Sequence, residues 1–364
     1  MSAGSPSIAQ SVWLVTEREI GSKLRSKAFV ISTVVMTALA LAAVVWGGLA
    51  AQTQTATPVA VTAQTQQVVA NLDGIAPMTV DSDSAAVALV EDGTVDAAIV
   101  ADPEASGPFD FKVVANDSVP SGLVAMLSVT PTVELLHGTP GDELLRYIVA
   151  IGFGVVFLFA ASLFGSTIAQ SVVEEKQTRV VELLISAIPV RALLAGKVLG
   201  NTILAMAQII VLVAIAVIGL SITGQGVVLT GLGGPLVWFA VFFLFGFVLL
   251  ASLFAAAGAM VSRQEDIGST TAPLTMLVML PYFMVIFFND NPVVLTVMSY
   301  VPFSAPVAMP LRIYLGEALW WEPLLSLVVL IATCIAAILV GARIYSNAIL
   351  RMGARVKLSE ALAG

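Results

Sequence analysis

The feature of this sequence that most limits its fold is a set of six long apolar runs. A helix needs about 20 apolar residues to cross the hydrocarbon core of a bilayer, and only the fifth run, at 17 residues, is shorter than this. The runs are Ala28–Ala50, Tyr147–Ile168, Val198–Ser221, Pro235–Val261, Ala272–Phe288 and Pro323–Tyr345. Only 11% of the residues are charged, against about 25% in typical soluble proteins. The sequence therefore predicts an all-α polytopic membrane protein with six transmembrane helices.

The first run is expected to stay in the protein as a transmembrane helix. It follows 27 other residues, and it is longer than the apolar core of a signal peptide, which has about 7–15 residues. The single cysteine, Cys334, lies in the last run. The external segment is therefore expected to fold without a disulfide.

The distribution of lysine and arginine predicts which side of the membrane each segment faces. These residues mark the cytoplasmic side of short loops. With the N-terminus inside, thirteen of the 16 fall in inner segments, and only Lys112, Arg146 and Arg312 fall outside. Six spans then return the C-terminus to the cytoplasm. The predicted domains are a cytoplasmic amphipathic helix at 1–27, a first span at 28–50, an extracytoplasmic domain at 51–146, five further spans within 147–346 and a cytoplasmic tail at 347–364.

The external domain is acidic and has the sequence pattern of a small α/β unit. Ala51–Glu143 holds 13 acidic residues and one basic residue, a balance that we expect to keep an exposed domain soluble. Segments rich in β-branched residues predict strands, and a serine- or aspartate-capped segment followed by glycine predicts a helix. The strands are MTVDS, DAAIVAD and FDFKVVAND, and the helix is SDSAAVALVEDG. The polar opening, QTQTATPVAVTAQTQQ, is expected to be a linker or an extension of the first span.

A segment with charges of both signs, Val172–Lys197, separates the second and third runs. Glu175, Arg179 and Glu182 recur at helical spacing and form one polar face. Pro189 then ends the helix, because proline has no N–H and clashes with the preceding turn. A helix lying on lipid is one interpretation, but mixed charges suit a protein partner better.

Two other inner elements also carry both signs. They are the amphipathic stretch SVWLVTEREIGSKLRSKAF before the first run and the loop SRQEDIG after the fourth. An interfacial anchor is an alternative role for the first of these, since its lysines and arginines can reach lipid headgroups. Together, the three elements predict a docking face for a cytoplasmic protein.

The segment Asn289–Trp321 is apolar but cannot cross the membrane. Four prolines interrupt it, namely Pro292, Pro302, Pro306 and Pro310. Irregular backbone at membrane depth has to be covered by protein. The segment therefore predicts an outer re-entrant or interfacial hairpin.

Four parts of the sequence resemble the permease subunits of type-2 ATP-binding-cassette (ABC) exporters, in the branch of the sodium-extrusion permease NatB. They are TEREIGSKLRSKAFVISTVV, VVEEKQTRVVELLISAIPVRALLAGKVLG, VSRQEDIGSTTAPLTMLVMLPYF with VPFSAPVAMPLRIYLGE, and ARIYSNAILRMGARVKL. The resemblance runs through the whole chain in order and is loosest in the external domain. It implies a multi-pass permease of the cell membrane that works as half of a homo- or heterodimer. A cytoplasmic ABC ATPase on a separate chain would drive it.

The resemblance also implies roles for particular residues. In that family, the first inner loop, here 169–197, forms coupling helices that fit a groove on the ATPase. The residues to which it gives a coupling role are Glu174, Glu175, Lys176, Arg179 and Glu182, with Pro189 and Arg191 shaping the turn. Further candidates in the other inner loop are Arg263, Gln264, Glu265 and Asp266.

Missing motifs restrict the function further. The nearest match to a P-loop, Ala195–Val198, lacks its first glycine and its hydroxyl residue. We therefore expect ATP and Mg²⁺ on the partner ATPase, and no cofactor, metal site, catalytic residue or nucleic-acid partner on this chain. The middles of the six runs hold no ionisable residue, which disfavours a secondary transporter.

The substrate is left open between two classes. Sodium is the one that the resemblance implies. An amphiphilic drug, peptide or lipid is the alternative, because a hard cation prefers several oxygen ligands and the runs offer no carboxylate. A membrane receptor or assembly protein, with a ligand-binding external domain, is a different class of function that the composition also allows.

Overall fold

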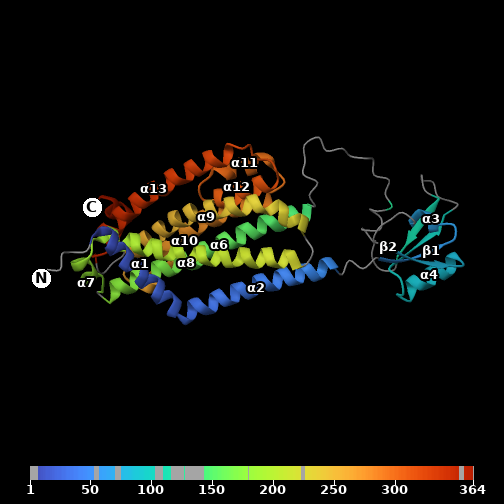
Figure 1. The fold of residues 1–364 in the computed structure, drawn as a ribbon, viewed down its shortest axis with the longest axis horizontal. Coiled ribbons are helices and arrows are strands. Elements are labelled where there is room, and N and C mark those ends of the chain that lie inside the picture. Colours follow the sequence, from blue (N-terminus) through green and yellow to red (C-terminus); the bar gives the residue numbers. More distant parts are fainter. Residues whose placement is uncertain are drawn as a thin grey trace. The chain divides into compact units, whose positions relative to one another are not determined.

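Long apolar helices form the larger of two units in the computed structural model (Figure 1). This helical unit comprises Met1–Val44 and His137–Gly364, and the smaller unit comprises Val45–Leu136. The structure describes residues 7–52, 57–69, 75–102, 110–115, 127, 143–178, 180–222, 226–351 and 356–363. Each unit is described on its own below.

The helical unit contains the predicted apolar runs as helices. The first four helices are α1 (Ile8–Arg25), α2 (Lys27–Gln52), α6 (Glu143–Gln177) and α7 (Val180–Ala187). They are followed by α8 (Val190–Ile222), α9 (Gly226–Ala259), the 3₁₀ turn η1 (Gln264–Asp266) and α10 (Ile267–Phe287). The last four are α11 (Pro292–Tyr300), α12 (Ala305–Tyr314), α13 (Glu322–Ala348) and α14 (Leu358–Ala363).

Within the described residues, five helices are long and apolar enough to cross a membrane. They contain Arg146–Gln177, Val190–Gly219, Gly231–Ala259, Gln264–Phe287 and Glu322–Ala348. The helices α1 and α2 meet at a bend of 69°, and counting them as one broken span raises the number to six. The prediction of a polytopic helical protein is thus confirmed, with five to six candidate spans.

Helix α9 lies at the centre of the unit and packs against α6, α8, α12 and α13. Phenylalanines at four-residue intervals along α9 meet phenylalanines of α6. The pairs are Phe153–Phe239, Phe157–Phe243 and Phe164–Phe247, with ring centroids 4.9, 5.8 and 5.6 Å apart. Close packing of this kind holds helices together where lipid removes the hydrophobic driving force. At Gly258, an added Cβ would come within 2.8 Å of the Ala169 carbonyl oxygen, so this crossing needs glycine.

The predicted hairpin between the fifth and sixth runs is a pair of short helices, α11 and α12, which pack against each other. Asn291 caps α11 by accepting hydrogen bonds from the backbone N–H groups of Val293 and Val294, at 3.1 and 3.2 Å. Pro292 occupies the first turn, where its missing N–H has no helical partner to lose. Pro292 and Pro306 lie in the first turns of α11 and α12, and Pro310 lies within α12, so the segment forms short helices instead of irregular backbone.

The smaller unit is a four-stranded sheet with the order β2-β1-β3-β4. Its elements are β1 (Thr57–Thr62), α3 (Gln66–Val69), β2 (Ile75–Val80), α4 (Asp83–Glu91), β3 (Ala97–Ala101) and β4 (Phe111–Val114). Strands β1, β2 and β3 pair in parallel, and β4 is antiparallel to β3. The three predicted strands and the helix are present, and Ser82 caps α4 as expected.

The interpretation of the opening segment as a linker or helical extension is wrong for Thr57–Thr62. This segment is the inner strand β1, and Val59, Ala60 and Val61 are fully buried. Apolar clusters cover both faces of the strand, with Val59 and Val61 in one and Ala60 in the other. A strand buried on both faces lacks the alternation that reveals a half-buried strand, and the flanking threonines and glutamines hide its short apolar core.

Candidate functional site

The residues predicted for coupling gather at one end of the helical unit. We call this the charged end, and it comprises α1, residues 174–197 and residues 262–266. Helices α1 and α7 lie together at this end (Figure 1). The side chains of Glu174, Glu182, Pro189, Arg191, Arg263, Gln264 and Glu265 are exposed, and Asp266 is half-buried. Arg179 lies outside the described residues.

Hydrogen bonds join the two predicted loops of the charged end into one surface. Gln264 donates from Nε2 to Glu174 Oε1 at 3.3 Å. One turn further along α6, Gln177 donates to the Ser262 carbonyl at 3.1 Å. These loops are about 90 residues apart in the sequence, so a partner docking on one would also touch the other.

Pro189 marks the break that the sequence predicts, and it directly precedes α8. A second interruption of the helix lies before Pro189, where α6 ends at Gln177 and α7 begins at Val180. At the end of α6, the Glu174 carbonyl accepts both from the Thr178 N–H, at 3.0 Å, and from the Thr178 hydroxyl, at 2.7 Å. The loop is thus a short helix, α7, held between two corners.

A buried cluster of charges lies inside the charged end, around Lys197 of α8. Its ammonium is 2.7 Å from Glu19 Oε1 of α1 and 3.1 Å from Glu175 Oε2 of α6. It also donates to the Ser171 hydroxyl at 2.8 Å. The Lys197 side chain is 1% exposed, and the two carboxylates are 7% and 8% exposed. The ammonium supplies the counter-charge that these desolvated carboxylates need.

Arg18 adds a second cation to the cluster, from the solvent side. Its guanidinium is 3.2 Å from Glu175 Oε1, and its side chain is 46% exposed. Glu175 therefore links an exposed arginine of α1 to the buried lysine of α8. We call Arg18, Glu19, Glu175 and Lys197 the lysine cluster.

The expectation that Glu175 and Lys176 face outward needs correction, since the structure buries both side chains. Lys176 donates from Nζ to the carbonyls of Ala259 and Ala348, at 2.8 and 2.9 Å. These carbonyls belong to the last turns of α9 and α13, where the helix dipole favours a nearby cation, and the Ala348 carbonyl also accepts from the Arg351 N–H at 3.1 Å. Any coupling role of these two residues is therefore expected to act through the interior of the chain. It remains a prediction, as it does for the exposed residues.

Helix α1 docks on α8 through two glycines of α8. This contact between the two helices was not among the sequence-based predictions. A Cβ added at Gly196 would lie 2.5 Å from Val15 Cβ, and one at Gly200 would lie 3.0 Å from Glu19 Cβ. The Thr16 hydroxyl also contacts the Gly196 carbonyl at 3.3 Å. The spacing Gly-x-x-x-Gly lets two helices approach closely. This motif was the available sequence signal for the contact.

Lys23, on α1 before the bend into α2, has a shifted pKa. Burial lowers the pKa of its ammonium to about 8, while the charges of Glu19 and Glu174 oppose the shift and that of Lys197 adds to it. At pH 7 the group therefore still carries its proton. It places another positive charge beside the lysine cluster.

We expect Gly196→Ala to loosen α1 from α8. Overpacking a close contact typically destabilises by about 1–3 kcal/mol, and here the added methyl would meet Val15 and the Val12 carbonyl oxygen. Thermal unfolding of the purified protein in detergent measures the effect. Gly152→Ala is the matched control, because no atom lies within 4 Å of its added Cβ. Equal unfolding midpoints for the two variants would contradict the proposed docking.

A second buried ion pair lies at the other end of α13, where α11 and α12 pack. Arg312 is 2.9 Å from Glu322 Oε2, and its guanidinium also donates to the Ser299 hydroxyl at 3.0 Å. Glu322 further accepts from the Leu319 N–H at 2.8 Å and from the Tyr300 hydroxyl at 3.2 Å. The charge distribution of the sequence predicts Arg312 only as an outer charge, whereas its side chain is 5% exposed.

Comparisons with known proteins identify the class of protein. A family model described as "ABC-2 family transporter protein" matches residues 27–343. The chain is 29% identical over 233 residues to the uncharacterized protein YhaP of Bacillus subtilis, covering 60% of this chain and 56% of that one. It is 26% identical over 215 residues to the uncharacterized protein MJ1024 of Methanocaldococcus jannaschii, covering 58% and 52%. The chain spans about half the length of these curated relatives. No solved structure gives a significant match.

Proposed function

Because the chain belongs to the ABC-2 transporter family, we propose that it is the permease subunit of an exporter of the cell membrane, powered by a separate ATPase. The family membership makes it a membrane component of a transporter and not itself a catalytic enzyme. In the proposal, ATP and Mg²⁺ bind to a cytoplasmic ABC ATPase. A second permease chain, identical or different, completes the transporter.

The observation that carries the proposal is the single surface formed by two mixed-charge loops at the charged end. Glu174 and Gln264 connect these loops directly. Exposed acidic and basic side chains side by side give register and specificity to a protein interface. We infer that this surface receives the ATPase.

The interior contacts support a route from that surface to the helices. Lys176 ties the end of α6 to the ends of α9 and α13. Glu175, its neighbour, ties the same turn to α8 and α1 through the lysine cluster. A push on α6 would therefore reach four other helices together, as rigid-body switching requires.

We expect the double charge reversal Glu174→Lys with Glu182→Lys to lower the amount of co-purified ATPase at least tenfold. Both side chains are exposed, so the substitutions change the proposed interface without breaking a buried ion pair. The full-length chain is tagged, the bound P-loop ATPase is identified by mass spectrometry, and its ratio to the permease is compared between variants. Reversal at Glu175 is a poorer test, because it would also break the buried pair with Lys197.

The matched control is Glu91→Lys with Asp96→Lys, which makes the same change of charge on exposed residues of the smaller unit. This control is expected to bind the ATPase like the wild type. If the Glu174/Glu182 variant inserts into the membrane and retains the wild-type ratio of ATPase, the charged end is not the docking surface.

Sodium is the proposed substrate that the NatB resemblance implies, and an amphiphilic drug, peptide or lipid is the second candidate. One observation favours the second. The buried carboxylates of Glu19, Glu175 and Glu322 already pair with Lys197 or Arg312, and so they are poor ligands for a further cation.

Vesicles containing the permease–ATPase pair should be tested with sodium and with a panel of amphiphiles, with and without ATP. Transport that persists without ATP would indicate a secondary transporter. If the chain neither transports any of these substrates nor binds an ATPase, a receptor would be favoured.

A further inference from the structure

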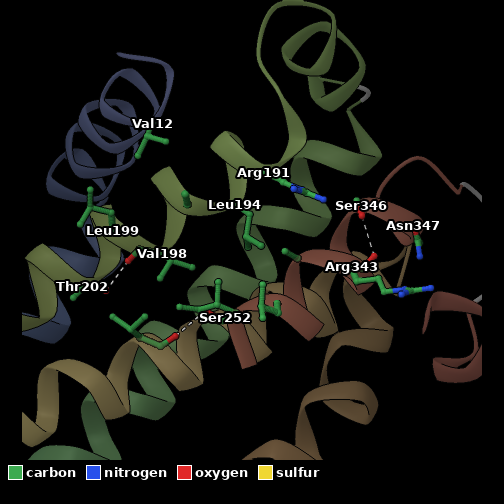
Figure 2. A pocket seen from close by; sticks show the side chains of 15 residues that line it. Val12, Arg191, Leu194, Val198, Leu199, Thr202, Ser252, Arg343, Ser346 and Asn347 are labelled. Carbon is green, nitrogen blue, oxygen red and sulfur yellow. Dashed lines mark hydrogen bonds between the residues drawn. The ribbon is translucent and has the colours of Figure 1, made fainter. Parts of the chain in front are cut away.

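A pocket with an apolar wall and a basic end lies between α1, α8, α9 and α13 (Figure 2). Its volume is about 860 Å³. Arg191 of α8 and Arg343 of α13 both line it, and Figure 2 shows them with Ser346 and Asn347 toward one side of the view. The lining residues include no carboxylate. The pocket is therefore amphipathic and carries two positive charges.

The two arginines are free to bind an anion. Both side chains are exposed. Within the part of the chain that the structure describes, neither makes an ion pair with an Asp or Glu side chain. A guanidinium can form two parallel hydrogen bonds to a phosphate. The basic end of the pocket thus has the chemistry of a phosphate site.

The position along α13 places this basic end at headgroup depth. Trp320 and Trp321 are exposed just before α13 begins, and tryptophan is enriched at membrane interfaces. Arg343 follows Trp321 by 22 residues, which is about 33 Å at the rise of an α-helix. This length is close to the hydrocarbon thickness of about 30 Å. Arg343 is therefore expected at the opposite interface from the tryptophans.

The polarity of the lining changes in the same direction on both helices. Moving inward from the interface, Arg191 is followed on α8 by Leu194 and Val198. On α13, which runs the other way, Arg343 is followed inward by Leu339 and Ile338. The Leu339 side chain is 67% exposed, so the apolar wall opens toward the surroundings of the bundle.

We propose that this pocket binds an anionic phospholipid from the surrounding bilayer. The phosphate lies between Arg191 and Arg343, and an acyl chain follows the apolar wall between α8 and α13. Basic pockets between transmembrane helices on the cytoplasmic side bind anionic headgroups, and the expected orientation puts this end inside. A peptide is the poorer occupant, because its backbone N–H and C=O groups would be unpaired along the apolar wall. This proposal does not depend on the choice of transported substrate.

The test compares lipid retention by the full-length chain and its variants, purified in detergent, by native mass spectrometry. We expect the wild type to retain phosphatidylglycerol in preference to phosphatidylcholine. Arg191→Gln with Arg343→Gln should lower phosphatidylglycerol retention about tenfold. The matched control is Arg351→Gln with Lys357→Gln, which removes two exposed cations outside the pocket lining. It should retain phosphatidylglycerol like the wild type.

A second variant, Ala195→Trp, fills the pocket while keeping both arginines, since Ala195 lines the pocket and is exposed. It should also lose phosphatidylglycerol, and inorganic phosphate alone should not displace the lipid from the wild type. Equal retention of the two lipids by the wild type would overturn the proposal. So would wild-type retention by either pocket variant, or displacement by inorganic phosphate, which would reduce the site to an anion site without an acyl chain.

Discussion

Replacing Lys197 with methionine is expected to destabilise the helical unit by about 3–5 kcal/mol, because it leaves two buried carboxylates without their shared counter-ion. Glu19 and Glu175 lie 2.7 and 3.1 Å from the ammonium. Methionine fills a similar volume but offers no charge, and Arg18 reaches only Glu175. Unfolding of the purified protein in detergent, followed by circular dichroism, measures the loss.

Two variants separate the electrostatic effect from a general sensitivity of this region. Arg18→Gln removes the half-exposed member of the lysine cluster, and such exposed pairs contribute about 1 kcal/mol or less. Glu19→Gln and Glu175→Gln combined with Lys197→Met remove all three buried charges and should restore much of the stability, since buried ion pairs can be replaced by neutral groups. A Lys197→Met protein as stable as the Arg18→Gln protein would contradict the expected role of the cluster.

The parts of the fold that sequence predicted well are those encoded by neighbouring residues. The apolar runs became α6, α8, α9, α10 and α13, and the proline-rich segment became the α11–α12 hairpin. The corner at Pro189 is also present. In each case, the length of an apolar run or the position of a proline fixes the element without reference to the rest of the chain.

The features that could not be predicted from the sequence depend on partners far away in the chain. Helical spacing put Glu175 on a polar face with Glu182, but the Glu175 side chain is buried against Lys197 and Arg18, whereas Glu182 is exposed. The hydrogen bonds of Lys176 reach across 83 and 172 residues. A charged residue at the end of an apolar helix is compatible with a docking surface and with an internal ion pair. Only the tertiary arrangement distinguishes the two.

The candidate surface itself was predicted in part. Glu174 and Gln264 were both proposed for coupling, from loops that sequence could not place together, and the structure joins them by a hydrogen bond. The contact of α1 with α8 was signalled only by Gly196 and Gly200, a motif too common to identify a partner helix by itself.

A second loss of about 3–5 kcal/mol is expected for Arg312→Met, which leaves Glu322 buried without its cation. Glu322 would keep its hydrogen bonds from Leu319 and Tyr300, but these do not balance a full charge. Because Arg312 also bonds to Ser299 of α11, we expect the α11–α12 hairpin to loosen from α13. Hydrogen exchange in the hairpin and the unfolding midpoint measure this change.

The control at this end is Arg146→Gln. Arg146 pairs with Glu317 at 3.2 Å, and about a third of each side chain is exposed, so the expected loss is about 1 kcal/mol or less. Arg312→Met combined with Glu322→Gln should recover stability relative to Arg312→Met alone. Faster hydrogen exchange in the hairpin for Arg146→Gln than for Arg312→Met would contradict the assignment.

Combining Lys197→Met with Arg312→Met tests whether the two ends of the bundle communicate. Helix α13 has 27 residues, which is about 40 Å at the helical rise, and it contacts Arg312 through Glu322 at one end and Lys176 through Ala348 at the other. Distant sites normally add within about 0.3–0.5 kcal/mol. Additive losses would mean that each cluster only anchors its own end. A larger departure would show that the two ends are coupled. Since Lys197 pairs with Glu175 of α6 and the neighbouring Lys176 bonds to the end of α13, the coupling path would run through α6 into α13, as a bundle driven from one end of a transporter needs.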